Sequence, residues 1–299
     1  MSFRTCPTRH LTTILAALLA CAPAPPALVD EALPAPAPPA LVDEALPAPA
    51  RRFLVGNETA HDLFARELAG RRGALLGVGG DACYTLMALA DSERAYLLDH
   101  DPQVVALHRA LGPRIAAAPD PGQFLAALAA PASPELAASW PAVTAHLRRV
   151  AARPHTWLSD PGLYARVHRL WQTGAVSPVL GDLGGALAMP TIAAHAAHAG
   201  LTFTVVYLSN VEESLPDRRR LDENLAALPR DPDALVLRTL HRPDWPAADL
   251  WSYQSHALTA LLARDRDRLG DLAAILADAA TRGTLTFTPQ APAHSTIAR

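Results

Sequence analysis

The sequence predicts an α/β domain with a doubly wound, mostly parallel sheet and a helical insertion, because strand and helix patterns alternate along the chain. The alternation is clearest over 74–101, where an apolar run of strand length, a glycine turn, a helical pattern and a second apolar run follow one another. It recurs over 178–208, which ends in the β-branched and aromatic run Leu201–Leu208. Parallel strands require crossover connections, so both stretches predict parallel neighbours in one sheet with helices on both faces.

Residues 1–21 have the pattern of a secretory signal. A basic start precedes the apolar run Leu11–Ala20, which is too short to span a bilayer. The run ends in Leu-Leu-Ala-Cys, which resembles a bacterial lipobox, so we expect cleavage before Cys21 and a lipid on that cysteine. This predicts an exported protein anchored to the membrane of the cell envelope. Two alternatives stay open: an ordinary signal, and a misplaced start codon ahead of a cytoplasmic protein beginning near Arg51.

Residues 22–50 are predicted to be a linker rich in proline and alanine. The stretch 25–37 is repeated without change as 38–50. Prolines at this density prevent a continuous helix and favour extended chain, which suits a spacer between membrane and domain. So perfect a duplication is more typical of recent DNA slippage than of a selected function.

The globular domain is predicted over 51–290, with a loose tail at 291–299. Residues 113–175 are alanine-rich and interrupted by prolines, which favours several short helices inserted between the second and third strands, where they could cover a ligand crevice. The remaining expected elements are a leading helix within 51–72, a strand over 234–240, a helix over 249–262 carrying Trp251 and Tyr253, a helix over 272–279 and a strand over 284–288.

The turn after the first strand has the residues of a nucleotide site. Gly77 and Gly79 allow a tight turn and a close approach of backbone to ligand. Asp99 ends the second strand, and its spacing from Gly77 is close to the roughly 20 residues at which an acid accepts hydrogen bonds from ribose hydroxyls. Asp81, at the N-cap position of the following helix, would repel a pyrophosphate but could pair with a ligand ammonium group, which favours S-adenosylmethionine over NAD. The alternative is a tight turn that binds nothing.

The stretch LLGVGGDACYTLMALADSERAYLLDHDPQVVALHR resembles the start of class I S-adenosylmethionine-dependent methyltransferases. It is more similar to an uncharacterised bacterial family of methyltransferase-like proteins. That family carries a GVG-x-D turn, here ending at Asp81, an acidic strand tip followed by a helix with a histidine, here His108, and a Y-L-S-N-x-E-E segment, here 207–213. The similarity covers roughly 52–290 and implies a Rossmann-like, methyltransferase-like fold. The chain departs from ordinary methyltransferases in having Leu75 and Asp81 where an acid and a third glycine are usual.

The resemblance implies roles for further residues at the same sheet edge. Asp182 would face the adenine side of the ligand. Asp101 is expected to line the crevice because of its own position at this edge, directly after the second strand. Asn210 or Glu212 would orient or deprotonate the methyl acceptor, since the tip of this strand faces the substrate in class I methyltransferases. The alternative is that the polar residues after this strand cap the next helix. For His108, the alternative to a functional role is that of a hydrogen-bonded core residue.

Composition excludes several classes of function. The formal net charge is −3, and cleavage of the signal would remove two arginines, which argues against a nucleic-acid partner. The chain has no lysine, which excludes a P-loop lysine and Schiff-base chemistry. Cys83 stands alone on an apolar helix face, so no disulfide is expected in the mature chain. The pair His195 and His198 has helical metal-ligand spacing, but no third ligand is identifiable, and no metal site is predicted.

Three functions follow as hypotheses. The first is a lipoprotein whose domain binds S-adenosylmethionine and transfers methyl to a small acceptor; methyl transfer needs mainly positioning, so a missing base is no strong objection. The second is a non-enzymatic envelope lipoprotein that uses the fold as a binding or interaction module. The third and weakest is a cytosolic NAD-type enzyme with a misplaced start codon.

Overall fold

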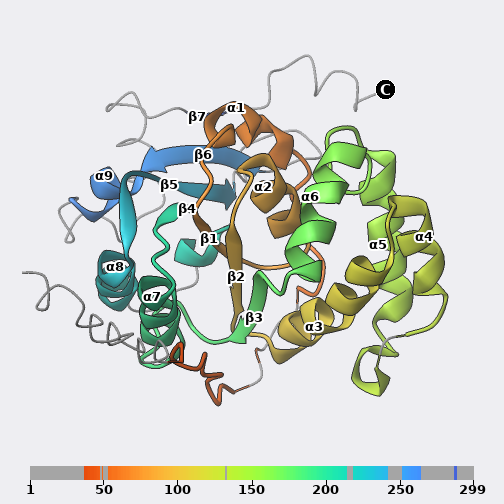
Figure 1. Ribbon diagram of the computed structural model, residues 1–299, viewed down its shortest axis with the longest axis horizontal. Coiled ribbons are helices and arrows are strands. Elements are labelled where there is room, and N and C mark those ends of the chain that lie inside the picture. Colours follow the sequence, from red (N-terminus) through yellow and green to blue (C-terminus); the bar gives the residue numbers. More distant parts are fainter. Residues whose placement is uncertain are drawn as a thin grey trace, which may run out of the picture. The chain divides into compact units, whose positions relative to one another are not determined.

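The computed structural model describes residues 37–47, 49, 53–131, 133–213, 218–241, 251–263 and 286–287 (Figure 1). All elements below belong to the compact unit Pro38–Arg299. Cys21, the signal, residues 25–36 of the first repeat copy, the helix expected over 272–279 and the tail lie outside the described residues.

A seven-stranded sheet forms the centre of this unit, in the order β3-β2-β1-β4-β5-β6-β7. The first five strands in this order are parallel, and β6 and β7 each pair antiparallel with their neighbour. The predicted mostly parallel sheet is therefore confirmed, including the parallel pairing of the strands that begin at Ala74 and Phe203. The strands are β1 Ala74–Val78, β2 Arg94–Asp99, β3 Val176–Leu180, β4 Phe203–Tyr207, β5 Arg230–His241, β6 Trp251–Ala257 and β7 Thr286–Phe287.

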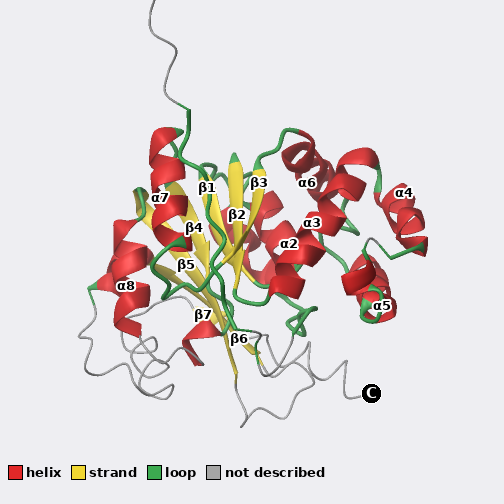
Figure 2. Ribbon diagram, turned by 90° about the horizontal axis from the view of Figure 1, so that it is seen from below, coloured by secondary structure: helices red, strands yellow, loops and turns green. Residues whose placement is uncertain are grey.

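Helices cover both faces of the sheet, as Figure 2 shows. One apolar core lies between the sheet and α2, α3 and α6; the other lies between the sheet and α7, α8 and α9. This arrangement is compatible with a Rossmann-like fold, in which the strand order switches from one side of the sheet to the other between β1 and β4. The helices are η1 His61–Phe64, α1 Ala65–Leu68, α2 Ala82–Leu89, α3 Pro102–Ala117, α4 Pro121–Ala126, η2 Ala127–Ala129, η3 Pro134–Leu136, α5 Trp140–Ala152, α6 Pro161–Gln172, α7 Ala188–His198, η4 Val211–Glu213, α8 Arg218–Ala227 and α9 Leu258–Leu262.

The strand β1 is buried along its whole length, as expected for a parallel strand covered on both faces. Gly77 within it allows α2 to pack closely, because a Cβ there would lie 2.7 Å from the sulfur of Cys83. Cys83 is a buried free thiol, in keeping with its place on the apolar face of the helix.

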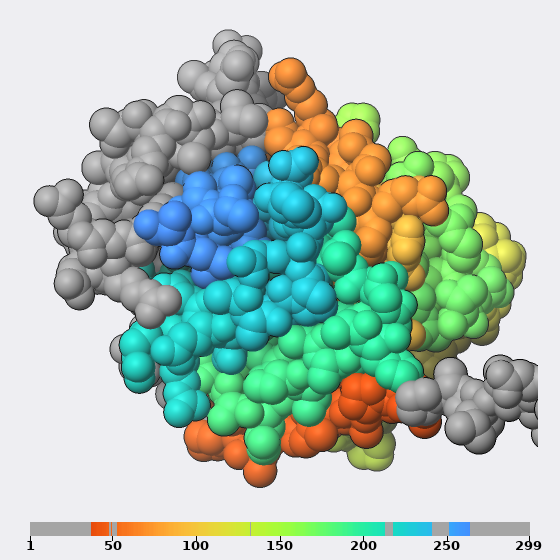
Figure 3. Space-filling view, turned by 60° about the vertical axis from the view of Figure 1, so that its left-hand side comes forward, coloured from red at the N-terminus to blue at the C-terminus, as the bar shows by residue number. Residues whose placement is uncertain are grey.

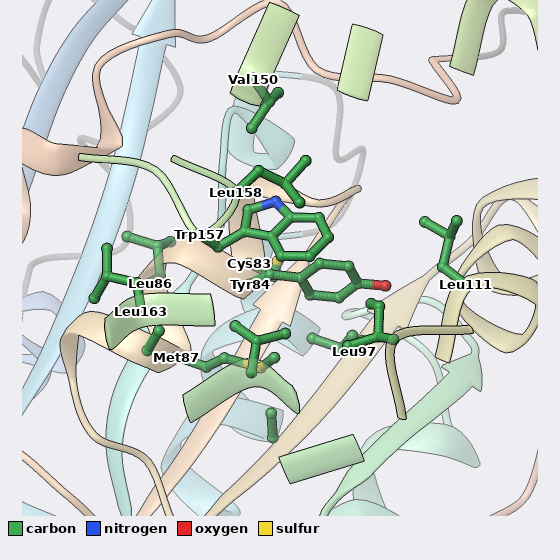
Figure 4. Close-up of a cluster of buried hydrophobic side chains, with 14 of the residues drawn as sticks. Cys83, Tyr84, Leu86, Met87, Leu97, Leu111, Val150, Trp157, Leu158 and Leu163 are labelled. Carbon is green, nitrogen blue, oxygen red and sulfur yellow. The ribbon is translucent and has the colours of Figure 1, made fainter. Parts of the chain in front are cut away.

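The inserted segment is helical, as predicted, and its last helix, α6, packs on α2 and α3 as part of the main core. The loop before α6 buries the indole of Trp157, whose ring meets that of Tyr84 edge-on at a centroid distance of 5.0 Å. Figure 4 shows these two rings at the centre of the apolar side chains from α2 and the insertion. The insertion is therefore part of the core of the domain.

Two expected helices are wrong in part. The leading segment forms only the short η1 and α1, and residues 53–60 before them are not helical. Trp251 and Tyr253 lie on the strand β6 and not on a helix. Because they are two residues apart, their side chains share one face of this strand, which is buried on both sides. No helix in the described part of the chain is long and apolar enough to cross a membrane.

The second repeat copy is in contact with the domain over Leu41–Glu44, although the sequence predicts a spacer throughout 22–50. Leu41 packs against the core that contains α7, and the side chain of Glu44 is 7% exposed. Figures 1 and 3 show the segment, coloured red, running beside α7. The spacer prediction is therefore wrong for Leu41–Glu44.

Candidate functional site

The glycine turn between β1 and α2 is held by residues of the next βα unit. Gly79 has φ +89°, a conformation that favours glycine, and its N–H donates to Oδ2 of Asp99 over 3.1 Å. Nε2 of His108, on α3, is hydrogen-bonded to the Gly79 carbonyl oxygen at 2.8 Å. The predicted proximity of the turn and Asp99 is a consequence of the parallel pairing of β1 and β2.

Asp99 and Asp101 are both buried and serve the backbone. The N–H of Asp101 donates to Oδ1 of Asp99 over 2.8 Å, and Oδ1 of Asp101 caps α3 by accepting from the N–H of Gln103. Burial raises the pKa of Asp99. Each carboxylate oxygen has two lone pairs, so both oxygens of Asp99 keep capacity for a ligand hydroxyl.

Asp81 occupies the N-cap position of α2, but its side chain makes no cap hydrogen bond. The carboxylate instead accepts from Nε2 of His146 at 2.7 Å and from Nε1 of Trp157 at 3.2 Å, both from the insertion. Burial alone raises the pKa of Asp81, but the hydrogen bond and charge of His146, together with Trp157, outweigh it and hold the pKa below its usual value. Asp81 is therefore a buried carboxylate that stays ionised.

A small cavity of about 30 Å³ lies against Asp81, between the leading segment and the insertion. The titratable side chains that line it are acids, imidazoles and one guanidinium, so the lining contains groups of both charge types. Among the lining histidines, His61 is hydrogen-bonded through Nε2 to the hydroxyl of Tyr207 at 2.8 Å. The lining residues are Gly56, Glu58, Thr59, His61, Asp62, Asp81, Ala82, Thr85, His146, Val150, Arg153, His155 and Thr156.

Residues 54–60, here called the strap, lie across the carboxyl ends of the strands. Oε1 of Glu58 accepts from the hydroxyl of Ser209 at 2.7 Å and from the hydroxyl of Thr239 at 3.2 Å. Ser209 follows β4, and Thr239 lies on β5. The hydroxyl of Tyr253 accepts from the N–H groups of Thr59 and Ala60 at 2.8 and 2.9 Å. The strap therefore covers the edge where open α/β sheets bind ligands.

Glu212 forms a buried ion pair instead of facing the crevice. Nη1 of Arg238, a fully buried residue of β5, donates to both Glu212 oxygens at 3.1 and 2.8 Å. This pairing occupies the carboxylate and argues against its use as a base. Asn210 is half-buried beside the hydroxyl of Ser209, whose φ of +50° turns the chain at the end of β4.

Asp182 lies beyond β3, where its carboxylate accepts from the N–H of Gly184 at 2.8 Å. Its own N–H donates to Oε2 of Glu44 at 3.2 Å, so a carboxylate of the same chain lies beside Asp182. The structure thus brings Gly77, Gly79, Asp81, Asp99 and Asp101 to the tips of β1 and β2, whereas Asp182 and Glu212 have other partners.

Sequence reasoning missed Glu58, His61, His146 and Trp157, because no local pattern connects these residues to Asp81 or to the strand ends. For Glu212 a signal existed: Arg238 interrupts the apolar run 234–240, and a buried arginine requires an acidic partner. Among the described residues, no group of three or more histidine, cysteine, aspartate or glutamate side chains could hold a metal ion.

A family described as a domain of unknown function, DUF7790, matches this chain over residues 53–140 and 129–286. The chain belongs to the DUF7790 family. No curated protein matches the sequence of this chain. The DUF7790 match begins at Phe53, so the strap, the glycine turn and the insertion lie inside the family domain, whereas Glu44 precedes it.

Proposed function

We propose that this domain binds a small ligand with a cationic amino group, S-adenosylmethionine being the first candidate, and transfers its methyl group to a small acceptor. The observation that carries the proposal is the ionised, buried carboxylate of Asp81 at a cavity beside the glycine turn. An ammonium group can pair with such a carboxylate, whereas a pyrophosphate would be repelled by it. The adenosyl ribose would reach Asp99, and Asn210 would contact the acceptor.

The cavity limits how this ligand enters. A space of about 30 Å³ holds roughly one water molecule. A ligand of adenosyl size therefore requires the strap to move away from the sheet edge. The hydrogen bonds of Glu58 and of Tyr253 to the strap are the contacts that such a movement breaks.

A second function, a binding or interaction module without catalysis, is favoured by the pairing of the site's acids within the chain. Asp81 is held by His146 and Trp157, and Glu212 by Arg238. On this proposal the strap stays in place, and the edge of the sheet contributes to stability only.

Calorimetry on the full chain separates the two proposals, and Asp81→Asn is the decisive variant. We expect the variant to bind S-adenosylmethionine at least about tenfold more weakly, because a charge-assisted hydrogen bond is lost. Binding of methylthioadenosine, which lacks the amino-acid part, should not change. Asp120→Asn is the matched control, because Asp120 caps α4 at the surface and asparagine caps equally well.

If the wild-type chain binds neither ligand, the adenosyl proposal is wrong and the non-catalytic one stands. If Asp81→Asn weakens both ligands equally, the ammonium pairing is wrong. The full chain is required, because a chain beginning at Arg51 would lack the contacts of Glu44 with α7.

We also propose that the chain is exported and held at a membrane by a lipid on Cys21. The apolar run ending at this cysteine supports the proposal. We expect labelled palmitate to enter the wild-type chain but not Cys21→Ser, and the variant to leave the membrane fraction, because acyl chains supply the anchoring free energy. Cys6→Ser is the control. Equal fractionation of Cys21→Ser and the wild type would contradict the lipid anchor.

A further inference from the structure

The corner between β3 and α7 is built to receive the side chain of Glu44. Oε1 accepts from the N–H groups of Leu187 and Ala188 at 2.8 and 2.7 Å, at the N-terminus of α7, where a negative charge is favoured. A Cβ on Gly185 would lie 2.4 Å from this carboxylate, so only glycine leaves room for it. The corner therefore fits a carboxylate in this one position.

The residues before Glu44 add contacts of their own. Asp43 pairs with Nη2 of Arg109 at 2.7 Å and accepts from the N–H of Leu180 at 2.9 Å. The N–H of Val42 donates to the hydroxyl of Thr191 at 3.3 Å, and Leu41 packs on the core. The tetrapeptide Leu-Val-Asp-Glu thus supplies a hydrophobic contact, a surface ion pair and a buried carboxylate.

The same tetrapeptide occurs at 28–31, within the first copy of the repeat. We propose that this corner is a docking site for Leu-Val-Asp-Glu and that residues 28–31 occupy it in exchange with residues 41–44 of the same chain. The two occupants are identical in sequence and in both flanks, since the whole of 25–37 is repeated as 38–50. Only the length of chain that connects each to the domain distinguishes them.

Loop closure sets the balance between the two copies. Leu54 is the next residue packed on the core, and the chain from Glu31 to Leu54 is more than twice as long as the chain from Glu44 to Leu54. The longer loop disfavours the first copy by roughly fourfold. Exchange would also change the free tether between Cys21 and the docked copy by the length of one repeat, or about 40 Å of extended chain. Together with the lipid anchor proposed above, on which this consequence rests, the repeat would give the domain two distances from the membrane.

Alanine variants of the two glutamates in the full chain test the exchange. We expect Glu31→Ala to leave the unfolding equilibrium almost unchanged and Glu44→Ala to shift it about fivefold, because the first copy then takes the site. The double variant should shift it by roughly fiftyfold or more, because no copy can make the three hydrogen bonds to the carboxylate. If Glu44→Ala alone equals the double variant, the first copy does not dock and the proposal is overturned.

A labelled peptide, Pro-Pro-Ala-Leu-Val-Asp-Glu-Ala-Leu-Pro, tests recognition directly by fluorescence anisotropy. It should bind the double variant saturably, and the same peptide with glutamine for glutamate should bind at least about tenfold more weakly. Absence of saturable binding would show that the tetrapeptide does not carry recognition, which overturns the proposal. The unfolding midpoint of Glu44→Ala should not depend on protein concentration; a dependence would overturn exchange within one chain.

Discussion

Replacing Arg238 by methionine is expected to lower the free energy of unfolding by about 3–5 kcal/mol, because Glu212 would be left as a buried charge without its partner. Both side chains are buried, with Arg238 at 0% and Glu212 at 6% exposure. Arg238 also donates to Nε2 of His256 at 2.8 Å, so its loss affects more than one group. Denaturant unfolding followed by circular dichroism measures the effect.

Two further variants make this expectation specific. Adding Glu212→Gln to Arg238→Met should recover most of the lost stability, since the buried charge is then gone. Arg219→Met removes an arginine that pairs with Glu223 at the surface, and should cost less than about 1 kcal/mol. A loss below about 1 kcal/mol for Arg238→Met would contradict a buried, compensating role for the pair.

The double variant also bears on Glu212 and the proposed ligand. A folded Arg238→Met/Glu212→Gln chain that still binds S-adenosylmethionine would show that the carboxylate of Glu212 is not needed to hold this ligand. The sequence places Glu212 at a strand end, where acids are usually solvated or face a ligand. The structure gives this residue a partner 26 positions later, on the next strand, a contact that local periodicity does not encode.

The parallel part of the fold was predictable because its strands are buried on both faces. Continuous apolar runs such as 74–78, separated by helical patterns of the expected length, have few other structures available. The antiparallel edge was less predictable. In β6, polar residues such as Gln254 alternate with Tyr253, and both are buried, so the usual contrast between an apolar and a solvated face is absent.

The candidate site was predictable only where backbone geometry determines it. Gly79 and Asp99 come together because the turn and the tip of the neighbouring strand are adjacent in any parallel βαβ unit. The partners of Asp81 come from an insertion 65 and 76 residues away, and their positions depend on how that insertion packs. The contacts of Glu44 with the domain were not predictable for another reason. Glu44 lies in a proline-rich repeat, whose composition favours extended chain without indicating a docking partner.

The last expected result concerns acid and the turn at Gly79. His108 is 1% exposed, is hydrogen-bonded to Gly79 through Nε2 and to the hydroxyl of Tyr84 through Nδ1, and has its pKa lowered by burial from 6.5 to about 4. Between pH 6.5 and about 4 the unfolded chain binds a proton at this position that the folded chain does not. The stabilising contribution of His108 is therefore complete above pH 6.5 and is lost as the pH falls towards 4, by about 3 kcal/mol in total.

Unfolding free energies measured across this pH range, for the wild type and for His108→Gln, isolate the contribution of this one imidazole from those of the other histidines. The variant starts from a lower stability, because its amide cannot reproduce both hydrogen bonds, but its free energy of unfolding should fall less steeply between pH 6.5 and 4. His198→Gln is the matched control, because it makes the same substitution at a histidine that is exposed on α7. Parallel pH profiles for the wild type and His108→Gln would show that His108 takes up its proton as readily in the folded chain as in the unfolded one. In that case the hypothesis that a neutral His108 holds the Gly79 turn would be wrong.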